Sequence, residues 1–259
     1  MTKKHDIIWL DTTDSTNEEA RRNILSLDNL SVVSAYSQTA GRGQRGNTWS
    51  SSPGENLTFS IVIKYGHEYG QTLPIRACDQ FSVSEAAALA VVDLLASYNI
   101  EAKIKWPNDI YVGDRKICGI LIENSLREGF MSSSIIGIGL NVNQTIFDPS
   151  LPNPTSMALA GKTQTQSLSL ETLLEEFLYI FKGYCSRYLN ITGGLSRLRR
   201  LYLSQMWRKD IQAKYMDMSD AHIFKGIIRG VTDMGLLIVE DTEKGELKEF
   251  AFKEISYII

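Results

Sequence analysis

The chain has 259 residues, and its 27 Lys and Arg against 30 Asp and Glu give a net charge of −3 at pH 7. This balance excludes the strongly basic surface that general nucleic-acid or membrane-surface binding requires. Hydrophobic residues make up 43% and charged residues 22%, as in ordinary globular proteins. No apolar run approaches the roughly 18 residues that cross a bilayer, and the N-terminus lacks a secretory pattern. We therefore expect a folded, cytoplasmic protein without a membrane span.

The three cysteines, Cys78, Cys118 and Cys185, lie far apart, with no CxxC pair and no His at ligand spacing. Reduced and unpaired thiols are expected of such cysteines in the cytoplasm. The sequence therefore offers neither a disulfide scaffold nor a zinc site.

The hydrophobic pattern of the first half predicts strands and one helix. Residues 56–64 have the period of a half-buried strand, with apolar side chains at Leu57, Phe59, Ile61 and Ile63. Residues 79–98 are apolar almost all round, which predicts a helix buried in the middle of a domain. Gly113-Asp114 predicts the turn of a hairpin between residues 110–112 and 116–122.

The second half predicts a further strand, two helices and a small β domain. Residues 134–142 form a strand candidate, and apolar residues recur at helix spacing over 170–181 behind a Ser169 N-cap. After a further helical stretch, short β-like runs alternate with glycine turns. We expect an α/β (α+β) body over residues 1–209 and a small all-β barrel over residues 210–259.

A glycine-rich segment follows a strand-like run at residues 32–36. It spells Gly41-Arg42-Gly43-Gln44-Arg45-Gly46 and matches the G-x-G-x-x-G pattern of dinucleotide-binding loops. Residues 47–54 include a Pro-Gly pair and cannot open the helix that would hold a pyrophosphate, which disfavours that fold. Glycines beside Arg42 and Arg45 instead describe a flexible loop that can wrap an anion. A solvated turn with incidental charge is the alternative that this loop alone leaves open.

A second polar segment lies close to the predicted hairpin. Lys105-Trp106-Pro107-Asn108-Asp109 places a cation, a large ring, a rigid turn and an amide beside a carboxylate, and the hairpin then brings back Lys116. At this point the chain resembles the biotin protein ligases, also called biotin–acetyl-CoA-carboxylase ligases. Four segments carry the resemblance in the family's order and spacing: Asp14 to Asn17, Gln38 to Trp49, Lys105 to Asp109 with Arg115 to Ile120, and Gly137 to Asn141.

The resemblance implies a catalytic domain related to class II aminoacyl-tRNA synthetases and lipoate ligases, followed by an SH3-like barrel. It implies that biotin and ATP give biotinyl-5′-AMP and pyrophosphate. A lysine of a biotin carboxyl carrier protein then attacks the activated carbonyl. ATP and Mg²⁺ are the implied cofactors, with the metal ligands unknown. The implied state is a monomer or homodimer that binds no nucleic acid.

The resemblance also implies roles for individual residues. Lys116 and Arg42 are the implied catalytic cations, because a carboxylate and a phosphate repel by about 4 kcal/mol at about 4 Å and an effective dielectric near 20. The implied biotin contacts are Ser15, Thr16, Gln38, Lys116 and Gly119. The implied adenylate contacts are Arg42, Gly43, Arg45, Trp49, Asn108, Asp109 and Asn141.

Several of these residues have structural alternatives. Ser15 and Thr16 fit a helix cap ahead of Glu18 and Glu19. Trp49 fits a packing role in the core, and Asn141 fits a purely structural polar strand end. Both the binding role and the structural role stay open for these residues at the level of sequence.

The chain departs from the family pattern in three places. Many relatives have a glycine loop richer in arginine, whereas Gln44 and Asn47 occupy two positions that can be basic. We therefore expect the adenylate to be retained more weakly or through a different distribution of contacts. The last strand ends in Tyr257-Ile258 where some relatives have Leu-Arg, so we do not expect an arginine of the barrel to contact the nucleotide. The Asp14 to Asn17 segment comes almost at once, so we expect a short monofunctional form without a DNA-binding module or repressor activity.

Two other functions compete with biotin ligation. Lipoate or octanoyl transfer would favour a differently patterned glycine segment and gives no reason for the Lys105 to Asp109 segment. A non-catalytic sensor of biotin or biotinyl-AMP is the alternative outside enzymology. Retained Lys116 and Arg42 disfavour it, because sensing biotin alone needs no phosphate clamp.

Overall fold

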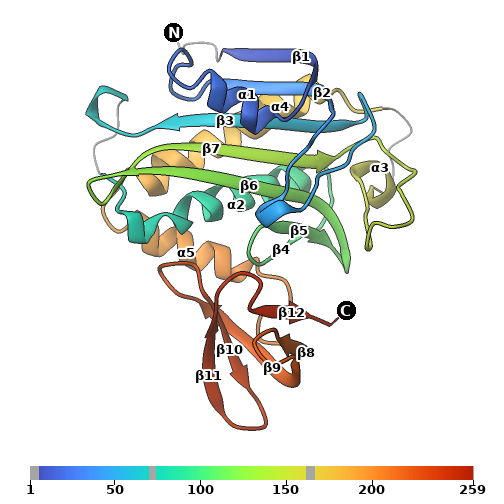
Figure 1. Cartoon of the computed structure of the whole chain (residues 1–259), viewed down its shortest axis with the longest axis vertical. Helices are drawn as coiled ribbons and strands as arrows, with labels where there is room; N and C mark the ends of the chain where they lie inside the picture. Colours follow the sequence, from blue (N-terminus) through green and yellow to red (C-terminus); the bar gives the residue numbers. More distant parts are fainter. Residues whose placement is uncertain (1–5, 70–73, 162–166, 259) are drawn as a thin grey trace.

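The computed structural model describes residues 6–69, 74–161 and 167–258 and places two sheets one beside the other (Figure 1). The larger sheet has seven strands in the order β1-β2-β3-β7-β6-β5-β4. The smaller sheet has five strands in the order β11-β10-β9-β8-β12. β1 and β2 pair in parallel, whereas the other neighbouring strands of both sheets are antiparallel. The chain thus has the mixed α/β fold that its sequence predicts.

The strands of the larger sheet are β1 (Ile7–Thr13), β2 (Val32–Gln38), β3 (Asn56–Lys64), β4 (Lys103–Lys105), β5 (Asp109–Val112), β6 (Arg115–Arg127) and β7 (Phe130–Asn141). The described α-helices are α1 (Thr16–Arg22), α2 (Phe81–Ser97), α3 (Met157–Ala160), α4 (Leu170–Tyr184) and α5 (Gly194–Ser204). The smaller sheet contains β8 (Gln212–Asp217), β9 (His222–Val231), β10 (Leu237–Asp241), β11 (Glu246–Phe250) and β12 (Ile255–Tyr257).

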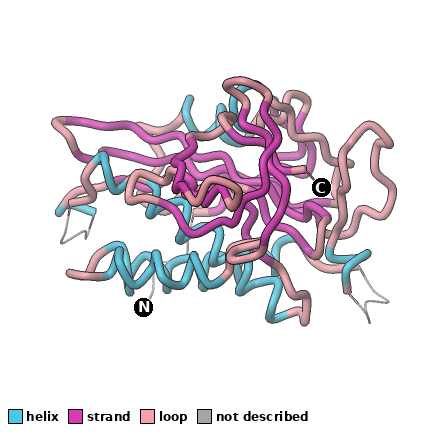
Figure 2. The backbone as a smooth tube through the Cα atoms, turned by 90° about the horizontal axis from the view of Figure 1, so that it is seen from below, coloured by secondary structure: helices cyan, strands magenta, loops and turns pink. Residues whose placement is uncertain are grey.

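Helices cover both faces of the larger sheet. α2 and α4 pack on one face over the main hydrophobic core, where Phe59 of β3 meets Phe177 of α4 edge to face. Figure 2 shows the long helices gathered along one side of the strands. α1 packs on β2, β3 and β7, over a smaller core of Ala20, Leu27, Val33, Val62 and Ile135. α1 therefore covers only part of this face of the larger sheet, over β2, β3 and β7.

β3 confirms the strand predicted over residues 56–64, but the expected half burial is wrong. Every residue from Asn56 to Ile63 is buried, because α1 covers the face that carries the polar side chains. Ser60 Oγ hydrogen bonds with Thr16 Oγ1 at 2.8 Å and with Asn17 Oδ1 at 2.6 Å. Both faces of β3 are therefore buried: most of its apolar side chains face the main core, and its polar side chains lie on the side of α1.

The helix predicted over residues 79–98 is confirmed as α2. The helical stretch Ala77–Ser97 is long and apolar enough to cross a membrane by length and composition alone, contrary to our expectation from sequence. However, 67% of its most apolar window is buried inside the protein. The run of small residues from Ala86 to Ala90 lies in the main core, and α2 contacts α4, α5 and three strands. Burial on nearly all sides explains its uniformly apolar sequence.

Other predicted elements are also present. The hairpin is formed by β5 and β6 around Gly113, which has φ of +58°. β7 contains the strand predicted over 134–142. α4 begins after Ser169, whose hydroxyl accepts a hydrogen bond from the Thr172 N–H at 3.2 Å, as expected of an N-cap.

The C-terminal strands form an antiparallel sheet, as the sequence predicts. The turns at Gly235 and Gly245 have φ of +87° and +69°, a region that favours glycine. In the described part of the chain no pairing joins β11 to β12, so the sheet is open rather than a closed barrel. It is compatible with the expected SH3-like architecture. The division into domains at residue 210 stays a prediction.

Polar contacts join the smaller sheet to the larger part of the protein. The Trp106 indole N–H donates a hydrogen bond to the Gly235 carbonyl at 2.8 Å. Arg199 of α5 donates one to the Thr232 carbonyl at 2.6 Å and pairs with the fully buried Glu85 of α2. Burial raises the pKa of Glu85 to about 7, although the nearby guanidinium of Arg199 opposes this shift.

We expect the stability contributed by Glu85 to decline as pH rises. Its pKa is about 7 in the folded chain against an ordinary 4.5, so the folded state holds the proton more tightly between these values. Relative to Glu85→Gln, which stays neutral, the wild-type free energy of unfolding should fall by about 1–3 kcal/mol from about pH 5 to about pH 8. Urea unfolding of both proteins measures this difference. A difference that stays constant or grows with pH would show that the ion pair with Arg199 outweighs burial.

Candidate active site

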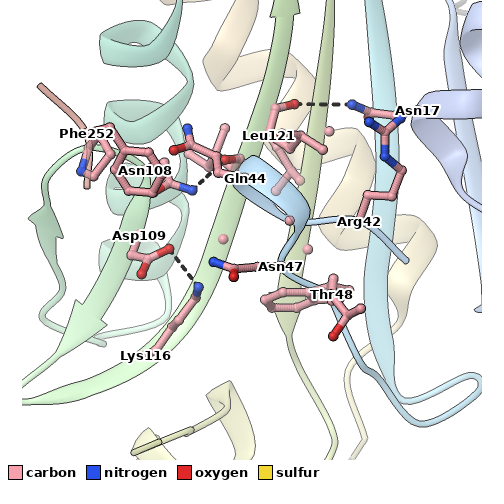
Figure 3. Close-up of a pocket in the computed structure, with 18 of the residues that line it drawn as sticks. Asn17, Arg42, Gln44, Asn47, Thr48, Asn108, Asp109, Lys116, Leu121 and Phe252 are labelled. Carbon is pink, nitrogen blue, oxygen red and sulfur yellow. Dashed lines mark hydrogen bonds and ion pairs between the residues drawn. The ribbon is translucent and has the colours of Figure 1, made fainter. Parts of the chain in front are cut away.

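A pocket of ≈ 280 Å³ opens on the face of the larger sheet that carries α1. Its walls come from α1, β2, the glycine-rich loop, the β5–β6 hairpin, β7 and the C-terminal residues around β12 (Figure 3). We use the term glycine loop for residues 41–49. Segments far apart in the sequence thus meet at one cavity.

One transverse row of paired residues forms the floor of this pocket. Lys105 of β4 pairs with Asp109 of β5, and Asp109 pairs with Gly119 of β6. Gly119 in turn pairs with Gly139 of β7, which pairs with Thr58 of β3. Directly paired residues point to the same face of a sheet, and strands lie about 4.8 Å apart. The row therefore places a cation and a carboxylate at one end and bare backbone in the centre.

The two glycines of this row make room for the Trp49 indole. A Cβ atom at Gly139 would lie 2.3 Å from the indole ring, and one at Gly119 would lie 3.2 Å from it. The Trp49 Nε1 atom is buried and has no hydrogen-bond partner in the described chain. The Trp49 ring thus packs against the sheet, as the structural alternative predicts. Its indole N–H lies beside the pocket without a hydrogen-bond partner in the described chain.

Lys116 and Asp109 form an ion pair in the pocket. The Lys116 Nζ atom lies 2.7 Å from Asp109 Oδ1, and the two side chains are 32% and 21% exposed (Figure 3). Lys116 Nζ also lies 5.8 Å from the centroid of the Trp49 ring. An ion pair this open to solvent contributes little to stability. An anion that enters the pocket can therefore compete with Asp109 for the ammonium group.

Neutral polar groups line the opposite end of the pocket. Ser15, Thr16 and Gln38 all line it, and the Thr16 N–H donates a hydrogen bond to Gln38 Oε1 at 2.8 Å. Ser15 occupies the N-cap position of α1, but its side chain makes no capping hydrogen bond. Ser15 therefore lies where a helix cap is expected, but its hydroxyl does not act as a cap. These groups suit a neutral ligand that needs hydrogen bonds.

The glycine loop closes on itself above the floor. The Gly43 N–H donates to the Asn47 carbonyl at 2.7 Å, and the Trp49 N–H donates to the Gly41 carbonyl at 2.9 Å. Gly43 lines the pocket as predicted. The side chain of Arg45 lies outside the described residues, whereas its backbone belongs to a short 3₁₀ turn at Gln44–Gly46.

Arg42 also lines the pocket, but its guanidinium is paired with two carboxylates. It forms ion pairs with Glu18 of α1 and, at 3.5 Å, with Glu123 of β6. In Figure 3 its side chain runs beside Asn17 rather than toward the Lys116–Asp109 pair. The Arg42 guanidinium must therefore leave Glu18 and Glu123 before it can bind another anion.

The two predicted asparagines are placed differently. Asn108 lines the pocket and fixes the hairpin, because its Nδ2 donates to the Ile120 carbonyl and its own carbonyl accepts from the Ile120 N–H, each at 2.9 Å. Asn141 is 5% exposed, and its Nδ2 donates to the Thr155 carbonyl at 2.8 Å. Asn141 does not line the pocket. Its buried hydrogen bond fits the purely structural role that the sequence left open.

Sequence reasoning missed several residues of the pocket. Asn17 packs against Gly137 and donates a hydrogen bond to Glu123 Oε2 at 3.0 Å. Lys105 lines the wall on the β4 side, where the C-terminal segment adds Phe252, Ser256 and Tyr257. A signal for Lys105 existed, because it opens the Lys105 to Asp109 segment. The C-terminal residues have no comparable signal, because they lie in no recognisable motif and reach the pocket only through the fold.

Comparisons with known proteins identify the family and the fold. The model of the biotin/lipoate A/B protein ligase family matches residues 9–141. A biotin–[acetyl-CoA-carboxylase] ligase of Paracoccus denitrificans is 30% identical over 88% of this chain and 91% of its own. A bifunctional ligase/repressor of Bacillus subtilis is 28% identical over 92% of this chain and 69% of its own. The biotin protein ligase of Aquifex aeolicus, solved with biotin and ATP, has a TM-score of 0.73 and 23% identity over 97% of each chain, which shows a shared fold.

The contact between Trp49 and the floor can be tested by adding one methyl group. Gly139→Ala should displace the indole and destabilise the fold by about 1–3 kcal/mol, because the ring cannot move into the sheet. Chemical unfolding and tryptophan fluorescence measure these effects. The matched control is Gly230→Ala in β9, whose added methyl group would make ordinary contacts of 3.7 Å. If Gly139→Ala costs as much in a Trp49→Ala background as in the wild type, the indole is not the group that requires glycine.

Proposed function

Because the chain belongs to the biotin/lipoate A/B protein ligase family, we propose that it is the enzyme that activates biotin with ATP and transfers it to a lysine of a carrier protein. The observation that carries the proposal is the position of Lys116. It stands over a glycine floor, between neutral polar groups at one end of the pocket and a second lysine at the other. This order of groups matches a neutral ring, a carboxylate and a triphosphate.

In the first step, the ureido ring of biotin would bind near Ser15, Thr16 and Gln38, with its carboxylate directed to Lys116. A carboxylate oxygen attacks the α-phosphorus of ATP, the bond to the bridging oxygen of the β-phosphate breaks, and pyrophosphate leaves. The ammonium group of Lys116 reduces the repulsion between the two anions and stabilises the charge that moves to the phosphoryl oxygens. Arg42 adds a second cation once it leaves Glu18 and Glu123.

In the second step, the amine of an acceptor lysine attacks the biotinyl carbonyl, AMP leaves, and the amine loses a proton. A free lysine has a pKa of about 10.4, so a carboxylate close to the amine assists the attack. Asp109 is suited to this role. When Lys116 turns to the phosphoryl group, Asp109 loses its partner and can orient the amine and accept its proton.

Mg²⁺ would bind mainly through the phosphates. Asp109 is the acidic side chain among the residues that line the pocket, and the described chain has no group of three or more His, Cys, Asp or Glu residues that could hold a metal ion. Mg²⁺ commonly uses one or two carboxylates together with substrate phosphates and water. The residues present fit that arrangement for the first step, in which the ion would neutralise part of the phosphate charge and Asp109 would be its protein ligand. Asp109 would be available to the acceptor amine only in the second step, after pyrophosphate has left.

The carrier domain of a biotin-dependent carboxylase is the acceptor that we propose, by analogy with the Paracoccus ligase. The expectations of cytoplasmic location, of a monomeric or homodimeric state and of no repressor activity stay predictions.

The proposed activity has a direct assay. Incubation with biotin, Mg-ATP and a carrier domain should label the carrier on a streptavidin blot, and omission of ATP should abolish the label. Lipoate in place of biotin, detected with an anti-lipoate antibody, is the control for the other branch of the family. Lipoylation without biotinylation would contradict the proposal.

Replacement of Lys116 separates binding from chemistry. Lys116→Ala should lower the rate of biotinyl-AMP formation about 10²–10³-fold, the usual cost of removing one group that stabilises transition-state charge. Biotin affinity, measured by calorimetry, should change much less, because the ring binds at the other end of the pocket. The control is Arg115→Ala, which removes the exposed neighbouring cation. Equal turnover by Lys116→Ala and the wild type would remove the proposed role.

A further inference from the structure

A second lysine of the pocket has an unusual environment. Lys105 Nζ donates a hydrogen bond to the Tyr111 hydroxyl at 2.9 Å. It also lies 4.6 Å from the centroid of the Tyr111 ring, 5.0 Å from that of Tyr257 and 5.8 Å from that of Trp207. These rings come from β5, from β12 and from the segment after α5. Three parts of the fold thus surround one ammonium group with aromatic faces, which attract cations.

Lys105 differs from the other cations of the pocket in its pairing. Lys116 is paired with Asp109, and Arg42 is paired with Glu18 and Glu123. Among the described side chains no carboxylate forms an ion pair with Lys105, and its hydrogen-bond partner is a neutral hydroxyl. Burial lowers the pKa of Lys105, which the more distant charge of Asp109 opposes. The positive charge of Lys105 is therefore partly desolvated, and in the described chain it is balanced only by the more distant charge of Asp109.

The position of Lys105 in the sheet suggests which anion it serves. In a phosphoryl transfer the attacking and leaving oxygens lie roughly in line across the phosphorus. The neutral polar groups and α1 lie on the side of β2, β3 and β7, and Gly119 lies in the middle of the floor. Lys105 is in β4, the edge strand on the opposite side, two strand spacings or about 10 Å from Gly119. The leaving group of an in-line attack would move toward it.

We propose that Lys105 binds the β- and γ-phosphates of ATP and then the departing pyrophosphate, held in place by the aromatic rings of Tyr111, Trp207 and Tyr257. Lys116 would serve the α-phosphate and the biotin carboxylate, so the two lysines divide the charge of the triphosphate. This inference rests on the proposed ligase function. It also gives the smaller sheet a part in the reaction, because Tyr257 of β12 reaches into the pocket and positions this cation.

The two half-reactions test this assignment in the full-length chain. In Lys105→Met, the KM for ATP in biotinyl-AMP formation should rise about tenfold or more, as expected when a charge-assisted hydrogen bond is lost. Pyrophosphate should inhibit the variant correspondingly less. Transfer from supplied biotinyl-AMP to a carrier domain should keep the wild-type rate, because no pyrophosphate takes part in that step. Lys105→Arg, which keeps the charge, should restore part of the ATP affinity.

The matched control is Lys103→Met in the same strand, whose Nζ donates to Gln205 Oε1 at 3.0 Å and which does not line the pocket. It should leave both half-reactions unchanged. If Lys105→Met slows transfer from supplied biotinyl-AMP as much as adenylate formation, or leaves the KM for ATP unchanged, the assignment is wrong. Failure of the wild-type chain to make biotinyl-AMP would instead contradict the ligase function itself, so the two failures are distinguishable.

Discussion

The ion pair between Lys116 and Asp109 is the interaction on which the rest of the site depends. The two residues come from the paired strands of one hairpin, which holds their charged atoms 2.7 Å apart. Each charge keeps the other in place, and partial exposure keeps the pair easy to separate. A ligand with a phosphate can therefore take the ammonium group and leave the carboxylate available. One exchange of partners would thus prepare both of the proposed steps.

The sheet explains why these groups meet at one level. Lys105, Asp109, Gly119 and Gly139 belong to a single row of paired residues that crosses neighbouring strands. The row has charged side chains at one end and none at its two central positions, which are glycine. A Cβ atom would collide with the Trp49 ring at Gly139 and contact it tightly at Gly119. α1 covers the row at one end, and β12 of the smaller sheet adds to the wall near the other. The pairing of the strands thus determines the order in which charged and uncharged groups line the pocket.

The sequence predicted the fold well where a short segment alone determines its own structure. The uniform apolar run of α2, the Ser169 cap and the turn at Gly113 are local signals, and the structure contains each of them. The burial of β3 was mispredicted because the partners of Ser60, in α1, are more than 40 residues away. The same limit applies to the pocket. Motifs indicated Lys116 and Asp109, whereas the aromatic rings around Lys105 come from segments that carry no shared local pattern.

The central claim is that Lys116 leaves Asp109 to hold the phosphoryl group of the adenylate. A crystal structure of the chain with a hydrolysis-resistant analogue of biotinyl-5′-AMP tests it most directly. We expect Lys116 Nζ to lie within hydrogen-bond distance of a phosphoryl or acyl oxygen, with the biotin ring beside Ser15 and Thr16. If Lys116 remains paired with Asp109 and no protein cation lies near the phosphate of the bound analogue, Lys116 does not have this role.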